Sequence, residues 1–346
     1  MGNFAKRVLF CLGLVLLAAS CATTAPQKKE DLVWPLPPEL PRIKYIDSYC
    51  CWNQFGTNSR EAWVNALFGV KEDLQMSKPY GITSDKDGKV YVTDTGLGTV
   101  WVFDEKAKKV SFLGAGQLRT PIGVAVDAKG RVFVSDSRAQ RVYAYNSEGK
   151  QVMVLGHQKD ELANPSGLAI DTKSNRLYVA NAKLHRIKVY DTNTGKFLFD
   201  IGERGSDKGD LNFPTNISVR NGKLYVTDTG NFRIQLFDLD GKLLKTFGRV
   251  GDQLGQFARP KGVDADSEGH IYVTDAAFDN FQIFNEEGQL LLFVGGKGSD
   301  PGSFWLPSGL HIDGKDRVYV ADQYNGRIQI FQYLNEKAAA ALAKNP

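Results

Sequence analysis

The stretch KLYVTDTGNFRIQLFD, residues 223–238, contains two runs of strand-forming residues on either side of a short turn. The first run includes Leu224 and Val226, and the second includes Ile234. Asp228 and Arg233 lie between the runs as an acid and a base. Such a pair fits a catalytic site, a ligand site or a contact of the framework. The number of copies in the chain separates these interpretations.

The same pattern occurs six times, because related stretches begin at residues 89, 131, 176, 223, 270 and 317. Each copy follows a segment that opens with a proline, usually as Pro-x-Gly. The leading prolines, 42 to 49 residues apart, are Pro79, Pro121, Pro165, Pro214, Pro260 and Pro307. A catalytic pair is normally present once, whereas a period of this size indicates a repeat architecture.

Each repeat is predicted to contain four antiparallel strands. A short apolar run, such as residues 124–126, precedes a tight Asp-x-x-Gly turn in which Gly supplies a positive φ. A second strand, the turn that contains the acid, a third strand and a fourth apolar run complete the unit. Four strands in about 45 residues without a helix are typical of a propeller blade. We therefore predict an all-β fold, a six-bladed β-propeller of four-stranded antiparallel blades.

The repeat reads Pro-x-Gly-[Ile/Val]-x-x-Asp-x-x-Gly-x-[Ile/Val]-Tyr-Val-[Thr/Ala/Ser]-Asp and ends in Arg-[Ile/Val]-Gln-x-Phe. It resembles the NHL repeat over about residues 77–333, and the resemblance implies the same propeller fold. Some positions depart from the pattern: Asn216 for Gly, Arg220 and Asn181 for Asp, and Thr99 and Asn280 for Arg.

The acid and the base of the opening stretch belong to a series. Its members are Asp94, Asp136, Asp228, Asp275 and Asp322, with Arg141, Arg186, Arg233 and Arg327. A group that repeats around a ring is interpreted as a structural clasp. The carboxylate would satisfy N–H groups of the turn, and the guanidinium would bridge to it or to a neighbouring blade.

The sixth repeat has no fourth strand of its own. Residues 334–346 have the composition of a C-terminal helix or tail. Upstream of the first repeat, PRIKYIDSY can pair as a strand, and an open ring would leave exposed edges. We therefore predict that residues 43–51 supply the missing strand and close the ring.

Residues 52–76 are predicted to form an insertion with a short helix. Trp63, Leu67 and Phe68 would share one face of this helix. That face either docks on the propeller or contacts a membrane or a partner. A helix of about 10 residues is marginally stable alone in water.

Residues 1–20 have the pattern of a signal peptide. Two basic residues precede an apolar run over residues 8–19, which is too short to span a membrane. The small residues before Cys21 resemble a bacterial lipobox, although Ala18 stands three positions before the cysteine. The resemblance implies lipidation of Cys21 and an extracytoplasmic protein anchored to the membrane. Ala22 after the cysteine indicates the outer membrane. A plain signal peptide cut nearby is the alternative.

Residues 21–42, which carry the lipidated N-terminus, are rich in proline and polar side chains. Such a segment has little to bury and is predicted to be an extended tether. About 20 residues at about 3.1 Å each give a reach on the order of 60 Å. The propeller would therefore stand away from the membrane.

The net charge argues against a nucleic-acid partner. The chain carries a formal charge of +4, and loss of residues 1–20 removes Lys6 and Arg7 and leaves +2. Some relatives with this fold bind RNA through a strongly basic face. This chain lacks that charge, and export also argues against nucleic acid as the natural partner. We expect a monomer without a cofactor.

Two cysteines, Cys50 and Cys51, remain after Cys11 is lost with the signal and Cys21 is lipidated. There is no Cys-x-x-Cys, which excludes a zinc ribbon or a c-type haem site. Adjacent strand residues point to opposite faces. We expect one buried and one half-exposed cysteine, with a disulfide between them as the alternative.

The first strand of each repeat is expected to line the channel, and one position in it carries the candidate catalytic residues. The matching residues are Thr83, Ala125, Ala169, Ser218, Asp264 and His311. Asp264 and His311 fall in successive blades, and a carboxylate that orients an imidazole is a usable base. The alternative is a polar pair that fills the channel. No metal site is predicted, since one inner histidine and one inner acid are too few ligands.

A partner is predicted to dock where the first strands begin, because side chains vary there while the framework repeats. The positions between Pro and Gly are Tyr80, Ile122, Ser166, Thr215, Lys261 and Ser308. The adjacent turns add Leu97, Arg138, Lys183, Leu184, Asn231, Phe278 and Tyr324. Aromatic and cationic groups are common at interface hot spots. The leading contacts are therefore Tyr80, Arg138, Lys261, Phe278 and Tyr324.

The sequence thus predicts a binding or scaffold module for a protein, a peptide or a cell-envelope glycan. The alternative is a metal-dependent hydrolase or lyase with a channel site near Asp264 and His311. The fold alone implies neither, because propellers host many functions.

Overall fold

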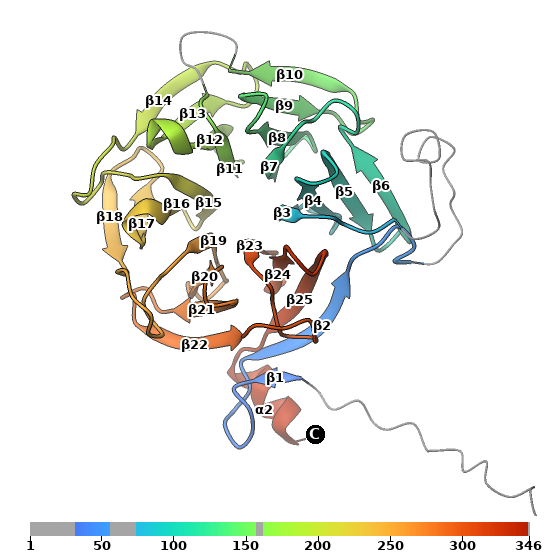
Figure 1. Cartoon of the computed structure of the whole chain (residues 1–346), viewed down its shortest axis with the longest axis vertical. Coiled ribbons are helices and arrows are strands. Elements are labelled where there is room, and N and C mark those ends of the chain that lie inside the picture. The colour runs from blue at the N-terminus through green and yellow to red at the C-terminus, as the bar shows by residue number, and fades with distance from the viewer. Residues whose placement is uncertain (1–31, 56–73, 157–161, 345–346) are drawn as a thin grey trace, which may run out of the picture. The chain divides into compact units, whose positions relative to one another are not determined.

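The computed structural model of the chain describes residues 32–55, 74–156 and 162–344. Six antiparallel sheets form a ring, and each sheet runs from an inner strand near the axis to an outer strand at the rim (Figure 1). The predicted six-bladed β-propeller is confirmed.

The first three blades follow one another along the chain. Blade 1 contains β3 (Pro79–Ser84), β4 (Val90–Asp94), β5 (Thr99–Asp104) and β6 (Lys109–Leu113). Blade 2 contains β7 (Pro121–Val126), β8 (Val132–Asp136), β9 (Arg141–Tyr145) and β10 (Gln151–Leu155). Blade 3 contains β11 (Pro165–Asp171), β12 (Arg176–Asn181), β13 (Arg186–Asp191) and β14 (Phe197–Ile201), with η1 (Ala182–Leu184) after β12.

The other three blades repeat this order. Blade 4 contains β15 (Pro214–Arg220), β16 (Lys223–Asp228), β17 (Arg233–Asp238) and β18 (Leu243–Phe247), with η2 (Thr229–Asn231) after β16. Blade 5 contains β19 (Pro260–Ala265), β20 (Ile271–Asp275), β21 (Asn280–Phe284) and β22 (Leu290–Gly295). Blade 6 contains β23 (Pro307–Ile312), β24 (Arg317–Asp322) and β25 (Arg327–Tyr333), and α2 (Glu336–Lys344) follows.

An N-terminal strand closes the ring, as predicted. In β2 (Ile43–Tyr49), Ile43 pairs with Tyr333 and Tyr49 pairs with Ile328 of β25. The structure adds β1 (Val33–Trp34), which pairs with β2 as a fifth strand of blade 6. Part of the segment predicted as an extended tether is therefore attached to the propeller, because the edge of β2 offers unpaired backbone groups.

Each inner strand packs closely against the next around the axis, and this explains the glycine of Pro-x-Gly. A Cβ atom on Gly81 would collide with the carbonyl oxygen of Ile122 in blade 2. The hydroxyl of Thr93 completes the contact: it accepts from the N–H of Gly81 at 2.7 Å and donates to the carbonyl of Ile122 at 2.7 Å. Ser135 and Thr274 make the equivalent bonds in blades 2 and 5.

An apolar core fills every interface between neighbouring blades. At the seam between blades 6 and 1, Trp101, Phe103 and Tyr319 pack with Ile328. Fully burying a large apolar side chain contributes roughly 1.5–3 kcal/mol. The same arrangement occurs at the other five interfaces. Repeated cores of this kind hold the ring rigid and fix the positions of the loops.

Cys50 and Cys51 form a disulfide directly after β2. Both cysteines are half-buried, so the expectation of one buried and one half-exposed thiol was wrong. The neighbouring backbone is tied to the insertion: the N–H of Met76 donates to the carbonyl of Cys50 at 2.8 Å. Trp52 stacks on Phe112 of blade 1, with ring centroids 5.7 Å apart.

Candidate functional site

The inner strands of all blades run in the same direction, so the two mouths of the channel differ. Each leading proline pairs with the last residue of the second strand, as Pro79 does with Asp94. The Pro-x-Gly loops and the turns between second and third strands therefore share one side, which we call the proline face. The inner strands end on the other side, at residues such as Ser84 and Ile312. We call this side the distal face.

Asp228 and Arg233 form a structural clasp on the proline face. Asp228 is fully buried, and its carboxylate accepts from the N–H of Asn212 at 2.6 Å and from Arg233 Nε at 2.8 Å. The guanidinium also donates to carbonyls of the loop between blades 3 and 4, at Ser206, Asp207 and Asp210. The interpretation of this pair as framework is confirmed.

The clasp is not uniform around the ring, and the prediction of one repeated arrangement was wrong for two blades. Arg327 repeats it in blade 6, with its Nε 2.8 Å from Asp322. Arg141 of blade 2 instead donates to the carbonyl of Gln140, because the loop before blade 2 (114–120) is shorter than the loop before blade 4 (202–213). Arg186 of blade 3 pairs with Asp200 at 3.1 Å, because Asn181 replaces the carboxylate.

The five leading partner-contact residues all lie on the proline face and keep accessible surface. Arg138 and Tyr324 are exposed, and Tyr80, Lys261 and Phe278 are half-buried. Their positions follow from the strand register, because each stands in a Pro-x-Gly loop or in a turn between second and third strands. This side also has a cavity of about 30 Å³ over the inner glycines.

Two other positions predicted on this ring are not available to a partner. Ser166 and Ser308 are buried. Ser166 Oγ donates to the carbonyl of Pro214 at 3.3 Å, and Ser308 Oγ donates to the carbonyl of Pro79 at 3.2 Å. Both hydroxyls therefore join neighbouring blades, and the prediction that they face a partner was wrong.

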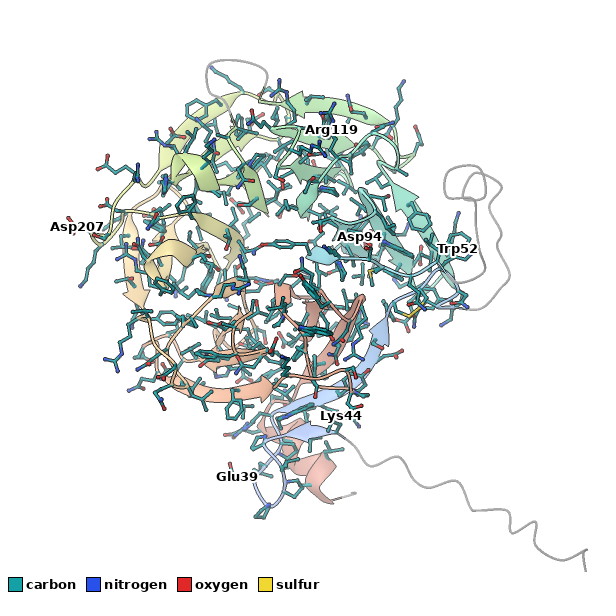
Figure 2. All side chains as sticks on the ribbon, in the orientation of Figure 1. Glu39, Lys44, Trp52, Asp94, Arg119 and Asp207 are labelled. Carbon is teal, nitrogen blue, oxygen red and sulfur yellow. A yellow bond between two sulfur atoms is a disulfide. The ribbon has the colours of Figure 1, made fainter. Side chains whose placement is uncertain are left out.

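Cations without carboxylate partners surround this mouth. They stand within two residues of a leading proline or in a turn between second and third strands: Lys78, Arg119, Arg138, Lys183, Arg259 and Lys261. Figure 2 labels Arg119 among them. Within the described residues none of the six forms a salt bridge. The carboxylate of those turns, Asp279, is buried and accepts from the N–H of Leu306.

Two exposed aromatic residues on the same face were missed by the sequence reasoning. Trp305 and Phe213, 46% and 49% exposed, lie just before leading prolines. The rings of Trp305 and Tyr324 are 5.5 Å apart, and Lys78 Nζ lies 5.9 Å from the centre of the Tyr324 ring. A large apolar residue at a loop position was the available signal. The proline face thus combines free cations with exposed aromatic surface.

The predicted pair Asp264 and His311 does meet in the channel, at the distal mouth. His311 Nδ1 lies 3.4 Å from Asp264 Oδ2, and both residues line a cavity of about 170 Å³. Arg220 Nε donates to Asp264 Oδ1 at 3.1 Å, and the N–H of Ile312 donates to Oδ2 at 2.8 Å. Burial alone would raise the pKa of Asp264, but Arg220, His311 and Ile312 stabilise the charge and lower that pKa to about 2.

Sequence reasoning missed the next member of this group. Ser84 Oγ lies 2.8 Å from His311 Nε2. Ser84 belongs to blade 1 and His311 to blade 6, so only closure of the ring brings the two together. In the described ranges no three His, Cys, Asp or Glu side chains are placed to share a metal ion.

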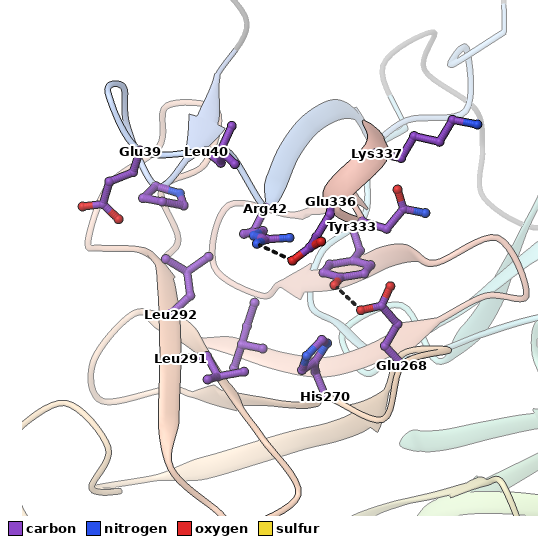
Figure 3. A pocket seen from close by; sticks show the side chains of 13 residues that line it. Glu39, Leu40, Arg42, Glu268, His270, Leu291, Leu292, Tyr333, Glu336 and Lys337 are labelled. Atoms are coloured by element: carbon purple, nitrogen blue, oxygen red, sulfur yellow. Dashed lines mark hydrogen bonds and ion pairs between the residues drawn. The ribbon is translucent and has the colours of Figure 1, made fainter. Parts of the chain in front are cut away.

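A larger cavity, of about 990 Å³, lies outside the ring beside the closing strand (Figure 3). Leu40, Leu291 and Leu292 form its apolar side. Several of its polar groups already pair with one another: Tyr333 donates to Glu268 at 2.8 Å, and Arg42 lies 3.8 Å from Glu336. These pairs leave less free charge for a ligand than the proline face offers.

Several sequence predictions fall outside the described residues: the signal peptide over residues 1–20, the lipidation site Cys21, the tether up to residue 31, and the short helix near Trp63. Among the helices that are described, none has the length and apolarity needed to cross a membrane.

Comparison with known proteins bears on the fold and the family. The NHL repeat family matches residues 162–190, 211–237, 257–284 and 304–331, which are parts of blades 3 to 6. No curated protein matches the chain by sequence.

Solved structures with a similar fold have diverse names. A virginiamycin B lyase from Staphylococcus aureus is 16% identical, with a TM-score of 0.55, and the match covers 75% of this chain and 96% of that one. An auxiliary nutrient binding protein from Bacteroides thetaiotaomicron is 16% identical, with a TM-score of 0.59, over 75% and 69% of the chains. A gluconolactonase from Xanthomonas campestris is 16% identical, with a TM-score of 0.58, over 84% and 98%.

At these identities the likeness concerns the fold alone, and it agrees with the blades described above. The four matched repeats and the six blades of one design identify the chain as an NHL-repeat β-propeller.

Proposed function

We propose that this propeller is a binding module that takes its partner on the proline face. The observation that carries the proposal is the group of six cations that have no carboxylate partner within the described residues. Cations grouped around one mouth raise the positive potential there, which favours a partner with negative groups. The partner class is a protein, a peptide or a cell-envelope glycan that presents such groups.

The aromatic residues of the same face support this proposal. Trp305 and Tyr324 keep about half of their surface exposed although they contact each other. Exposed aromatic rings next to cations are typical of interface hot spots, because a partner that covers them gains both apolar burial and charge contacts. The rigid blades beneath hold these side chains in place before the partner arrives, which lowers the ordering cost of binding.

The fold neighbours are compatible with this proposal but do not select it. They include a lyase and a nutrient binding protein, so the same architecture serves catalysis and binding.

The test requires a partner, which crosslinking in the cell envelope followed by mass spectrometry would identify. Alanine is then placed at Tyr80, Arg138, Lys261, Phe278 and Tyr324, and affinity is measured on folded protein. We expect several of the five to weaken binding at least about fivefold, equivalent to about 1 kcal/mol. Affinity should also fall as salt rises.

Matched control changes belong on the distal face, at the exposed residues Lys129 and Lys315. Their alanine variants should bind like the wild type. If the distal changes weaken binding while the five proline-face changes do not, the partner uses the other side and the proposal is wrong.

We also propose that the module is held on the extracytoplasmic side of a bacterial membrane, in the outer membrane, by lipid on Cys21. The support is the signal-like segment before Cys21 and the proline-rich stretch after it. Cys21→Ala should leave the precursor unprocessed or release the protein from the membrane fraction. A variant that fractionates and migrates like the wild type would exclude this anchor.

A further inference from the structure

The inner strands of this propeller repeat one pattern, and the departures from it gather at a single place. The position five residues after the leading proline is apolar in five blades, at Val126, Ile170, Val219, Ala265 and Ile312, but it is Ser84 in blade 1. The position before it is ionisable only at Asp264 and His311. The turn that follows begins with Asp in five repeats but with Arg220 in blade 4.

These four exceptional residues form one connected chain. Arg220 donates to Asp264, Asp264 faces His311 Nδ1 at 3.4 Å, and His311 Nε2 lies 2.8 Å from Ser84 Oγ. They come from blades 4, 5, 6 and 1 in succession. A framework contact would be expected to repeat around the ring, as the hydroxyls of Thr93 and Thr274 do. This series of contacts from Arg220 to Ser84 occurs once among the six blades, as expected for a functional site rather than for a framework contact.

The geometry points to an activated nucleophile: we propose that Ser84, His311 and Asp264 form a metal-free relay that cleaves small acyl esters at the distal mouth. The order of the bonds fixes the roles. A carboxylate accepts hydrogen bonds only, so Asp264 holds the proton on His311 Nδ1. His311 Nε2 is then the acceptor for the hydroxyl proton of Ser84.

Asp264 is built to stay charged in this role. It is 2% exposed and receives hydrogen bonds from the N–H groups of Ile312 and Ala265 at 2.8 and 2.9 Å, in addition to those from Arg220. The contact of 3.4 Å to His311 is longer than a normal N–H···O bond. Catalytic hydrogen bonds are often long in empty sites and shorten when substrate binds.

The reaction balances with water as the second substrate. Ser84 Oγ attacks the ester carbonyl carbon, and its proton passes to His311 Nε2. The bond from carbon to the leaving oxygen breaks, and His311 returns the proton to that oxygen. Water then attacks the acyl group on Ser84 with the same transfers, which releases the acid and restores the serine.

A cavity of about 170 Å³, lined by Asp264 and His311, lies beside the relay. This volume is below the roughly 300–1,000 Å³ of ordinary ligand pockets, which favours a small acyl group with the leaving group outside. Arg220 lines the cavity from blade 4, and its Nε and Nη2 donate to Asp264.

A fluorophosphonate probe tests the relay, because it reacts with activated serines and needs no known substrate. The wild type should gain one probe adduct, mapped to Ser84 by peptide mass spectrometry, and should hydrolyse p-nitrophenyl acetate faster than the octanoate. Ser84→Ala should abolish both signals. His311→Asn should slow labelling on the order of 100-fold. Ser218→Ala is the matched control, since this hydroxyl lines the same cavity without a hydrogen-bond partner.

All variants are first checked for wild-type circular dichroism and melting. If Ser84→Ala does not fold, Ser84→Cys replaces it, and loss of fluorophosphonate labelling with gain of iodoacetamide alkylation at residue 84 supports the relay. The proposal is overturned if the folded wild type takes no label, or if the label lies elsewhere. It is also overturned if His311→Asn is labelled as fast as the wild type. Each of these results would mean that the contacts among Arg220, Asp264, His311 and Ser84 only hold neighbouring blades together.

Discussion

The two faces of this propeller are built from the same repeated strands but use their charged side chains differently. On the distal face Arg131 pairs with Asp127 at 2.6 Å and Arg317 pairs with Asp313 at 2.8 Å, whereas the exposed lysines Lys129 and Lys315 form no salt bridge within the described residues. Around the mouth of the proline face, six cations have no such partner within the described residues. Paired charges contribute to the framework, whereas unpaired charges on rigid loops remain available to another molecule.

On the proline face, the residues that stabilise the fold are buried, and the candidate binding residues are exposed. The clasp of Asp228 is fully buried and holds the loop before blade 4, whose Asp207 lies at the outer edge of the ring in Figure 2. The side chains that vary between blades, such as Tyr324 and Arg138, lie above it and are exposed. Changes in the buried layer should therefore alter stability, and changes in the exposed layer should alter binding.

The largest expected effect is loss of a clasp carboxylate. Asp228→Ala leaves Arg233 and the N–H of Asn212 without their acceptor. Removing one partner of a buried ion pair costs roughly 3–5 kcal/mol, so the free energy of unfolding in urea should fall by that amount. Asp207→Ala, at an exposed position, is the control and should stay within about 0.5 kcal/mol. A loss below about 1 kcal/mol for Asp228→Ala would show that the clasp is not structural.

A matched pair of arginines sharpens the same point. Arg233→Ala should destabilise by roughly 1–3 kcal/mol, because it leaves buried acceptors unpaired. Arg141→Ala removes the equivalent residue of blade 2, which bonds only the exposed carbonyl next to it, and should change stability by less than about 0.5 kcal/mol. Equal losses in urea denaturation would mean that the two blades use their arginines alike, contrary to the structure.

The dependence of stability on pH should show whether the buried carboxylate of Asp264, on the distal face, is charged. The pKa of Asp264 is lowered from 3.8 to about 2 in the folded protein. A group with a lowered folded pKa stabilises the protein above its unfolded pKa and loses that contribution as pH falls through the folded value. The contribution is on the order of 2 kcal/mol. The difference in unfolding free energy between the wild type and Asp264→Asn should therefore shrink between about pH 4 and pH 2. A constant difference would argue against a charged Asp264.

The smallest expected effect on stability is at the free cations. Arg259→Ala and Lys183→Ala remove exposed side chains without salt bridges in the described structure. The free energy of unfolding, measured in urea, should change by no more than about 0.5 kcal/mol. Relief of mutual repulsion could make the change slightly stabilising. A large destabilisation would place these residues in the framework and remove the contrast between the faces.

The sequence was sufficient for the blades but not for contacts between distant segments. Repetition of Pro-x-Gly and of the strand pattern determined the six blades, and the missing fourth strand pointed to residues 43–51, of which Ile43–Tyr49 form β2. Strand β1 could not be predicted, because two residues carry no periodicity and pair only once β2 is in place. Arg141 and Arg186 contact other partners than Arg233 does, because the loop before blade 2 is short and because Asn181 replaces the aspartate in blade 3.

The candidate site was likewise predicted from the sequence only in part. Asp264 and His311 were predicted because they break the pattern of a repeated strand position. Ser84 lies in the first blade and His311 in the last, 227 residues apart, and only the closed ring places them 2.8 Å apart. Burial of Ser166 and Ser308 was missed for a similar reason: their acceptors are backbone carbonyls of the neighbouring blade, which no sequence pattern marks.

Site-specific photocrosslinking in the native cell tests most directly whether the proline face binds the partner. A benzophenone amino acid is placed at Tyr324 on the proline face and at Lys315 on the distal face, both of which are exposed. The account predicts one reproducible adduct from position 324, lost when Arg138 and Lys261 are changed to alanine, and no such adduct from position 315. An adduct from position 315 with none from position 324 would contradict it.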